Sequence, residues 1–273
     1  MKNILVLTDF SKVAEMATDY AIALAQQFRS EIHFLHTIGL SEVYSHRSYP
    51  LEIVRSIENR LIDHENKAAD LGLPARHFTP INRPHFDIEG HVRDYEHDLV
   101  IIGSHGLDGI NELFSQSNAQ EIVRHCPCPV LVIKKKPKKV IFDHITFASR
   151  FFPDDHQPFS ELLSFVATLK ASLNLLYINT PYNWEKPDLI KQRMKAFAAS
   201  HHLKEIQCFV EYNKSTEDGI LSYLHSNQTD LFAIATHGRT GFGRLVQPNF
   251  TETLVNHMEN PILTLRKGQD EKA

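Results

Sequence analysis

The chain has 273 residues, 42% of them hydrophobic and 23% charged, which is the composition of a globular protein. Its formal net charge of −4 excludes nucleic-acid binding through a broadly basic surface, and no apolar run approaches the ~20 residues that span a bilayer. The three cysteines lack the spacing of a disulfide framework, and the apolar stretch after Met1 is too short for a signal peptide. We therefore expect a cytoplasmic protein with reduced thiols.

The first half of the chain alternates short apolar runs with helical patterns. Apolar spacing predicts a first helix over 13–28 with Ser11 as its cap, and a second helix that Gly72 ends. Further helices are expected around 86–96 and 118–126. The runs typical of buried strands are 3–8, 31–37, 75–80, 98–103 and 129–134.

The second half repeats this pattern. The segment "DLVIIGSHGLDG" (98–109) matches "DLFAIATHGRTG" (230–241), and "PVLVIKK" (129–135) matches "PILTLRK" (261–267), so residue 98 corresponds to 230 and 129 to 261. The charged stretch "KKKPKK" is typical of a linker, and we predict domains over 1–138 and 139–273. The strands expected in the second domain are 144–149, 173–179, 206–211, 230–236 and 261–266.

Strands that alternate with helices form parallel sheets with helices on both faces. The sequence therefore predicts an α/β fold with two tandem Rossmann-like domains, each built on a five-stranded parallel sheet. In such folds ligands bind outside the carboxyl ends of the strands, at the point where the strand order reverses. The segment "GSHG" (103–106) falls at such an end.

The loop after residue 102 carries residues suited to a phosphate. Gly103 and Gly106 allow the backbone to approach a ligand closely, and the N–H groups of such a turn bind anions. Ser117 or Asn118 begins the next helix, whose N-terminus is a second anion site. The same glycines also fit a strand-to-helix turn that binds nothing, and the spacing alone leaves both interpretations open.

A resemblance to a known family extends this interpretation. The pattern G-x-x-G, nine residues, then G-[ST] resembles the nucleotide-binding signature of the universal stress protein family. The segments "NILVLTDFS", "EIHFLHTI" and "PVLVIK" resemble the first, second and last strands of that family. The two copies cover nearly the whole chain, which thus looks like a tandem UspA-like member with the adenine nucleotide alpha hydrolase-like fold.

The resemblance implies a site for ATP or a related adenine nucleotide in the first domain only. Asp9 would face the adenine end, Thr37 would lend its backbone to the adenine, and Ile102 would contact the ring. Gln116 stands where the signature has glycine, and the family also has members that bind no ATP. The site residues implied by the resemblance are Asp9, Thr37, Ile102, Gly103, His105, Gly106, Ser117 and Asn118.

The second copy departs further from the signature. Ala235 replaces the first glycine, and Pro248 and Asn249 replace the G-[ST] pair. Ser149 or Arg150 stands where the first copy has its aspartate. We expect this half to be a structural or partner-binding copy.

Other kinds of chemistry have weaker support. The stretch "RHCPCP" (124–129) spaces its cysteines as C-x-C, without the paired C-x-x-C of a zinc site, so no metal is expected. The chain has neither a P-loop nor a G-x-S-x-G motif nor a carboxylate cluster, so an enzyme is not expected. The resemblance implies a stress-response protein that acts by ligand-dependent binding. Two alternatives stay open: a scaffold that binds partners without nucleotide, and a slow nucleotide hydrolase that uses His105.

The last apolar runs of the two copies bear on assembly. Both would lie at sheet edges, which soluble proteins rarely leave unpaired. The family is similar in pairing these strands between subunits. We therefore expect the two copies to pair within the chain, and a homodimer of chains stays open. The expected small-molecule partner is an adenine nucleotide, the protein partner is unknown, and neither nucleic acid nor membrane is expected.

Overall fold

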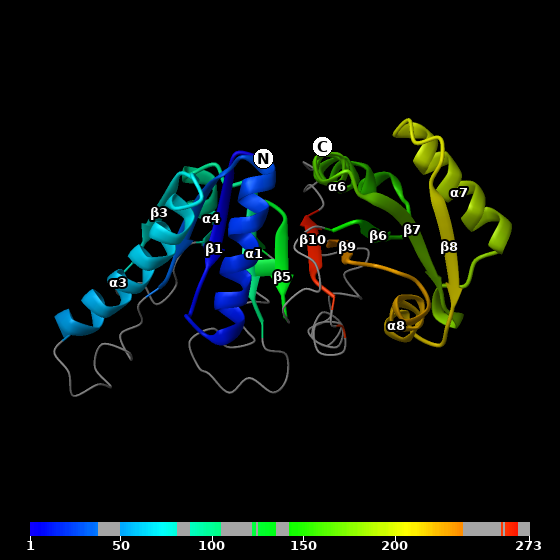
Figure 1. Cartoon of the computed structure of the whole chain (residues 1–273). Helices are drawn as coiled ribbons and strands as arrows, with labels where there is room; N and C mark the ends of the chain where they lie inside the picture. The colour runs from blue at the N-terminus through cyan, green and yellow to red at the C-terminus, as the bar shows by residue number, and fades with distance from the viewer. Residues whose placement is uncertain are drawn as a thin grey trace. The chain divides into compact units, whose positions relative to one another are not determined.

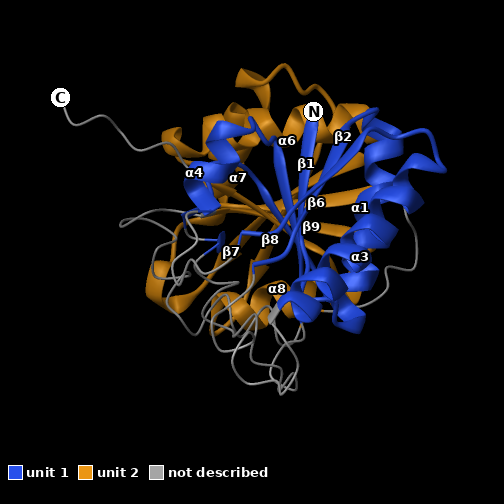
Figure 2. Ribbon diagram, turned by 90° about the vertical axis from the view of Figure 1, so that its left-hand side faces the viewer, with its two compact units in different colours: residues 1–136 blue, residues 137–273 orange. Residues whose placement is uncertain are grey.

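The structure is a computed structural model that describes residues 1–37, 50–80, 88–104, 122–123, 125–134, 142–236, 258 and 260–266. The chain divides into two compact units, Met1–Lys136 and Pro137–Ala273, each built on five parallel strands (Figures 1 and 2). Within the described ranges no helix combines the length and apolar character needed to cross a membrane.

Unit 1 confirms the five predicted strands of the first half. They are parallel and follow the order β3-β2-β1-β4-β5, so the strand order reverses between β1 and β4. Helices α1 and α3 lie on one face of the sheet and α4 on the other (Figure 2). The elements are β1 (Asn3–Leu7), α1 (Lys12–Phe28), β2 (Glu31–Leu35), α3 (Pro50–Ala69), β3 (Ala75–Phe78), α4 (Ile88–Asp94), β4 (Leu99–Gly103) and β5 (Val130–Ile133).

The helix signals of unit 1 act as predicted. The Ser11 hydroxyl accepts a hydrogen bond from the Ala14 N–H at 3.2 Å and so caps α1. Gly72 has a φ of +76° just beyond α3, and its N–H donates to the Ala69 carbonyl at 2.8 Å. The helix predicted over 118–126 lies mostly outside the described residues, although Ile122, Val123 and His125 are helical.

Unit 2 has the same plan. Its parallel strands follow the order β8-β7-β6-β9-β10, with α6 and α7 on one face and α8 on the other (Figure 1). The elements are β6 (His144–Ala148), α6 (His156–Leu169), β7 (Ser172–Asn179), α7 (Pro187–Ser200), β8 (Gln207–Tyr212), α8 (Thr216–Ser226), β9 (Leu231–Thr236) and β10 (Ile262–Arg266), with short 3-10 turns at η3 (Pro153–Asp155) and η4 (Pro181–Asn183).

The repeat is visible in the backbone as well as in the sequence. Phe10 after β1 and Phe151 after β6 have φ angles of +58° and +59°. Arg29 at the end of α1 and Lys170 at the end of α6 have φ angles of +54° and +55°. Non-glycine residues rarely adopt such angles, so their recurrence at matched positions shows that the two units share one backbone design.

Candidate functional site

Three of the residues expected to bind a ligand lie at one edge of the unit 1 sheet. Asp9 and Thr37 each follow the last residue of their strand by two positions, and Gly103 is the last residue of β4. These strands are neighbours in register, because the last residue of β1 pairs with the last residue of β2 and with Ile102 of β4. The three residues therefore lie together at the carboxyl ends of β2, β1 and β4, where the strand order reverses.

The other half of the predicted site cannot be placed. His105, Gly106, Gln116, Ser117 and Asn118 lie outside the described residues. The assignment of phosphate contacts to this loop therefore remains a prediction from the sequence.

Asp9 uses one of its two carboxylate oxygens to form the turn into α1. Oδ1 accepts a hydrogen bond from the Ser11 N–H at 2.9 Å. Oδ2 makes no hydrogen bond to any residue that the structure describes, and the side chain is only partly buried. The turn thus fixes the carboxylate and leaves an acceptor for a ligand N–H or O–H group.

Thr37 presents its backbone beside Asp9. Its N–H and C=O make no hydrogen bond within the described part of the chain. The preceding residue, His36, is buried, and its Nδ1 lies 2.7 Å from the Thr8 carbonyl oxygen, so Nδ1 carries the proton and donates. This bond ties the end of β2 to the end of β1 and positions the Thr37 peptide groups.

Gly103 is required by the fold for space. A Cβ atom there would lie 2.7 Å from the carbonyl carbon of Val13 and 2.8 Å from the nitrogen of Ala14. Glycine therefore lets the start of α1 approach β4, whatever contact the residue makes with a ligand. The neighbouring Ile102 is 3% exposed and packs in the core, and its predicted contact with a bound ring remains untested.

Arg60 lies at this edge and was missed by the sequence analysis. Its guanidinium lies 4.1 Å from the centre of the Phe10 ring, and Nη2 donates to the Phe10 carbonyl oxygen at 3.2 Å. The same guanidinium is 3.8 Å from a carboxylate oxygen of Glu15. Arg60 belongs to the polar face of α3 and to no motif, so only the tertiary structure reveals a cation against Phe10, the residue after Asp9.

The comparison with protein families settles the resemblance of this half. The model of one family, described as the universal stress protein family, matches residues 1–134. The N-terminal half of the chain belongs to the universal stress protein family.

Individual relatives agree with this result. The universal stress protein MJ0577 of Methanocaldococcus jannaschii is 26% identical over 155 residues, which cover 50% of this chain and 96% of that protein. The crystal structure of a universal stress protein from Archaeoglobus fulgidus DSM 4304 is similar to this chain, with a TM-score of 0.77 and 16% sequence identity. The similarity covers 98% of this chain and 97% of the Archaeoglobus chain. At that identity the similarity shows the fold of the whole chain and nothing about ligands.

A plant relative has been solved with a ligand. It is a universal stress protein family protein of Arabidopsis thaliana with AMP bound, 18% identical over 50% of this chain and 92% of its own. Its TM-score of 0.36 is too low to position a ligand in this chain.

Unit 2 carries different residues at the matching edge. The Ser149 hydroxyl accepts a hydrogen bond from the Phe151 N–H at 3.1 Å, as the Thr8 hydroxyl does from the Phe10 N–H at 3.0 Å. Arg150, and not Ser149, therefore occupies the position of Asp9.

The glycine of the family signature is also replaced in unit 2. Four residues (8–11) connect β1 to α1, whereas seven (149–155) connect β6 to α6. Ala235 is buried at the position that matches Gly103. In unit 1 the start of α1 excludes a Cβ atom at that position, whereas in unit 2 the longer connection makes α6 begin later, which fits an alanine there. Pro248 and Asn249 lie outside the described residues.

The cysteines behave as buried or partly buried thiols. Cys126 is buried, and its Sγ lies 3.6 Å from Sγ of Cys128. The hydrogen bond between these thiols and their burial raise the pKa of Cys128. Among the described residues no group of three or more His, Cys, Asp or Glu side chains is arranged to hold a metal ion.

Proposed function

We propose that unit 1 binds ATP or a related adenine nucleotide at the carboxyl edge of β2, β1 and β4. The protein would act in the cytoplasm as a stress-response protein whose ligand changes its binding to a partner. One observation carries this proposal. Asp9 and Thr37 follow adjacent strands in register, and within the described residues the Asp9 Oδ2 atom and the Thr37 N–H and C=O groups make no hydrogen bond. Membership of the universal stress protein family supports the proposal.

These groups complement an adenine nucleotide. The edge of an adenine ring presents one N–H donor group next to a ring nitrogen that accepts, and a backbone C=O and N–H at Thr37 match that pair. Asp9 Oδ2 would accept a hydrogen bond from the base or from a ribose hydroxyl. The phosphates would lie on the loop that contains Gly106 and Ser117, where N–H groups at a helix start bind anions.

The proposal is tested by calorimetric titration of ATP into the full chain and into Asp9→Asn. A hydrogen bond to a charged group contributes about 1.5–3 kcal/mol, so we expect the substitution to weaken ATP binding by about tenfold or more. Asp70→Asn makes the same charge change at an exposed position beyond the end of α3 and should leave the affinity unchanged. Equal affinities of wild type and Asp9→Asn would contradict the proposed role of Asp9.

Gln116 favours one alternative function. A side chain where the signature has glycine suits a scaffold protein that binds partners without nucleotide. If the scaffold interpretation holds, Gln116→Gly will raise the ATP affinity from undetectable to measurable in the same titration. If the nucleotide site is intact, the wild type will already bind and the substitution will change the affinity little.

A further inference from the structure

Unit 2 places a positive charge at the position where unit 1 has its carboxylate. Asp9 and Arg150 both lie two residues beyond the end of the central strand, and each precedes a phenylalanine with a φ angle close to +58°. The turns are the same and the charge is reversed. A ligand at this edge of unit 2 must therefore offer acceptors or negative charge, whereas a ligand of Asp9 must offer donors.

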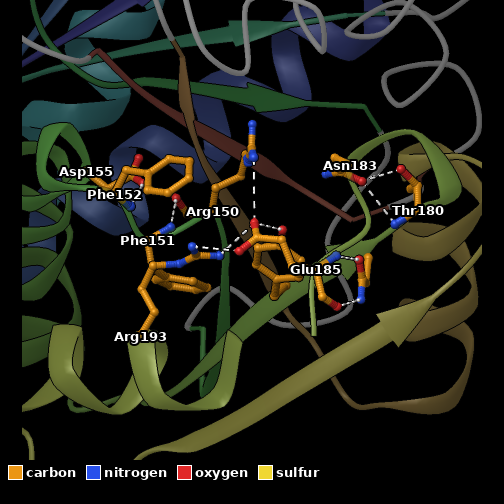
Figure 3. A network of polar contacts seen from close by, with 11 residues as sticks. Arg150, Phe151, Phe152, Asp155, Thr180, Asn183, Glu185 and Arg193 are labelled. Atoms are coloured by element: carbon orange, nitrogen blue, oxygen red, sulfur yellow. Dashed lines mark hydrogen bonds and ion pairs between the residues drawn. The ribbon is translucent and has the colours of Figure 1, made fainter. Parts of the chain in front are cut away.

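The carboxylate closest to Arg150 already has its hydrogen bonds. Glu185 accepts two bonds from Arg193, at 2.9 and 3.0 Å, and one from the Tyr177 hydroxyl at 2.8 Å (Figure 3). The bonds from Arg193 lower the pKa of Glu185 and keep it ionised near neutral pH. Arg193 and Glu185 thus form a complete two-pronged ion pair.

Arg150, by contrast, uses few of its donors. Its Nη2 forms an ion pair with Glu185 Oε1 at 3.7 Å, beyond hydrogen-bond length, and the guanidinium makes no hydrogen bond to any residue in the described ranges. Its Nε is closed off from solvent without a partner there. The side chain as a whole is 34% exposed, so part of it is open to solvent.

The surroundings of Arg150 hold two positive charges close together. The Arg150 and Arg193 guanidinium carbons lie 4.8 and 4.7 Å from the centre of the same Phe152 ring. The face of that ring attracts both cations but does not neutralise them. The other nearby carboxylate, Asp155, is buried and accepts the Phe152 N–H at 2.9 Å, so it holds the loop.

We propose that unit 2 binds a small oxyanion, a phosphate or a carboxylate, through the fork of Arg150. The planar guanidinium matches two oxygens of either group and would gain the hydrogen bonds it lacks here. Glu185 supplies one negative charge against the two guanidiniums, and the anion would balance the second. This site is separate from the nucleotide site of unit 1 and would give the chain a second, chemically different ligand.

The test follows the arginine Nε–H signals of the full chain by NMR with 15N-labelled arginine. The Arg150 signal is assigned by its loss in Arg150→Gln. Inorganic phosphate and malonate are then titrated separately, with chloride holding the ionic strength constant. We expect the Arg150 signal to move and to saturate with phosphate, with malonate or with both. Phosphate alone would identify a phosphate-type ligand, and malonate alone a carboxylate.

Two variants separate binding from a change in net charge. Arg150→Lys keeps the charge but loses the fork and, with binding followed on the neighbouring Arg193 Nε–H signal, should weaken binding by about tenfold. Lys191→Gln removes a positive charge from an exposed position on α7 and should not change it. A signal that stays still in both titrations, or moves linearly without saturating, would overturn the proposal. In that case Arg150 would only fill the edge of the sheet.

Discussion

At the scale of single residues, three described histidines of unit 1, His33, His91 and His97, form one cluster in the packed structure. His97 is 5% exposed, and its Nε2 lies 2.8 Å from Nδ1 of His33, whose Nε2 lies 3.0 Å from Glu31. His33 therefore donates to the carboxylate, and His97 donates to His33. The ring of His91 stacks on that of His97, with 5.4 Å between their centres. Because burial penalises a charge, the neutral forms of His91 and His97 are favoured in the folded protein.

This cluster predicts that unit 1 loses stability in mild acid. Burial lowers the pKa of His97 to about 3 and that of His91 to about 4, whereas an unfolded histidine titrates near 6.5. Below about pH 6.5 the unfolded chain binds protons that the folded chain excludes, so stability present above that pH is lost as the pH falls. The free energy of unfolding should drop by up to about 1.4 kcal/mol per pH unit for each histidine.

Urea unfolding between pH 7 and 4.5 checks this prediction, since the slope of stability against pH should be smaller for His97→Gln. His225→Gln, at an exposed position on α8, should leave the slope as in the wild type. Equal slopes for all three proteins would show that His97 does not carry the effect.

At the scale of elements, the repeated aspartates join strands at the edge opposite the site. Asp98 accepts hydrogen bonds from the backbone N–H groups of Lys2 and Asn3, the latter at 3.1 Å, and so ties the start of β1 to the start of β4. Asp230 accepts from the N–H groups of Asp143 and His144, both at 3.0 Å. The aspartate that begins the repeated segments "DLVIIG" and "DLFAIAT" thus joins two neighbouring strands in each unit. We call Asp98 and Asp230 the clamp residues.

Removing either clamp charge should destabilise the protein. We expect Asp98→Asn and Asp230→Asn each to lower the free energy of unfolding by about 1–3 kcal/mol. In each variant a neutral Asn side chain replaces a carboxylate that accepts hydrogen bonds from two backbone N–H groups. Asp70→Asn should change it by less than about 0.5 kcal/mol. Chemical denaturation with urea measures all three. A loss at Asp70 as large as at the clamps would mean that net charge and not the hydrogen bonds is responsible.

The elements also show what the sequence can and cannot predict. Buried parallel strands, the Ser11 cap and the Gly72 stop depend on local spacing, and all are confirmed. Arg60 beside Phe10 and Arg193 beside Glu185 depend on side chains brought together by packing, for which no local spacing exists. The close approach of α1 to Gly103 likewise could not be predicted, because only the fold shows α1 within reach of the Cβ position of Gly103.

At the scale of the whole molecule, the two units share one backbone design but differ in the polar groups at the carboxyl ends of their strands. Unit 1 presents an acceptor on Asp9 and open peptide groups on Thr37, whereas unit 2 presents Arg150 with unused donors. Duplication followed by a change of charge at one turn would let each unit take a different ligand. We therefore expect a single nucleotide site per chain, in unit 1.

The most direct measurement is the nucleotide content of the purified full chain. The protein is dialysed against ATP, freed of unbound ligand and denatured, and the released nucleotide is identified by mass and counted against protein. We expect about one adenine nucleotide per chain for the wild type, a marked loss for Asp9→Asn and no change for Arg150→Gln. No nucleotide from the wild type, together with no heat on titration with ATP, would contradict it.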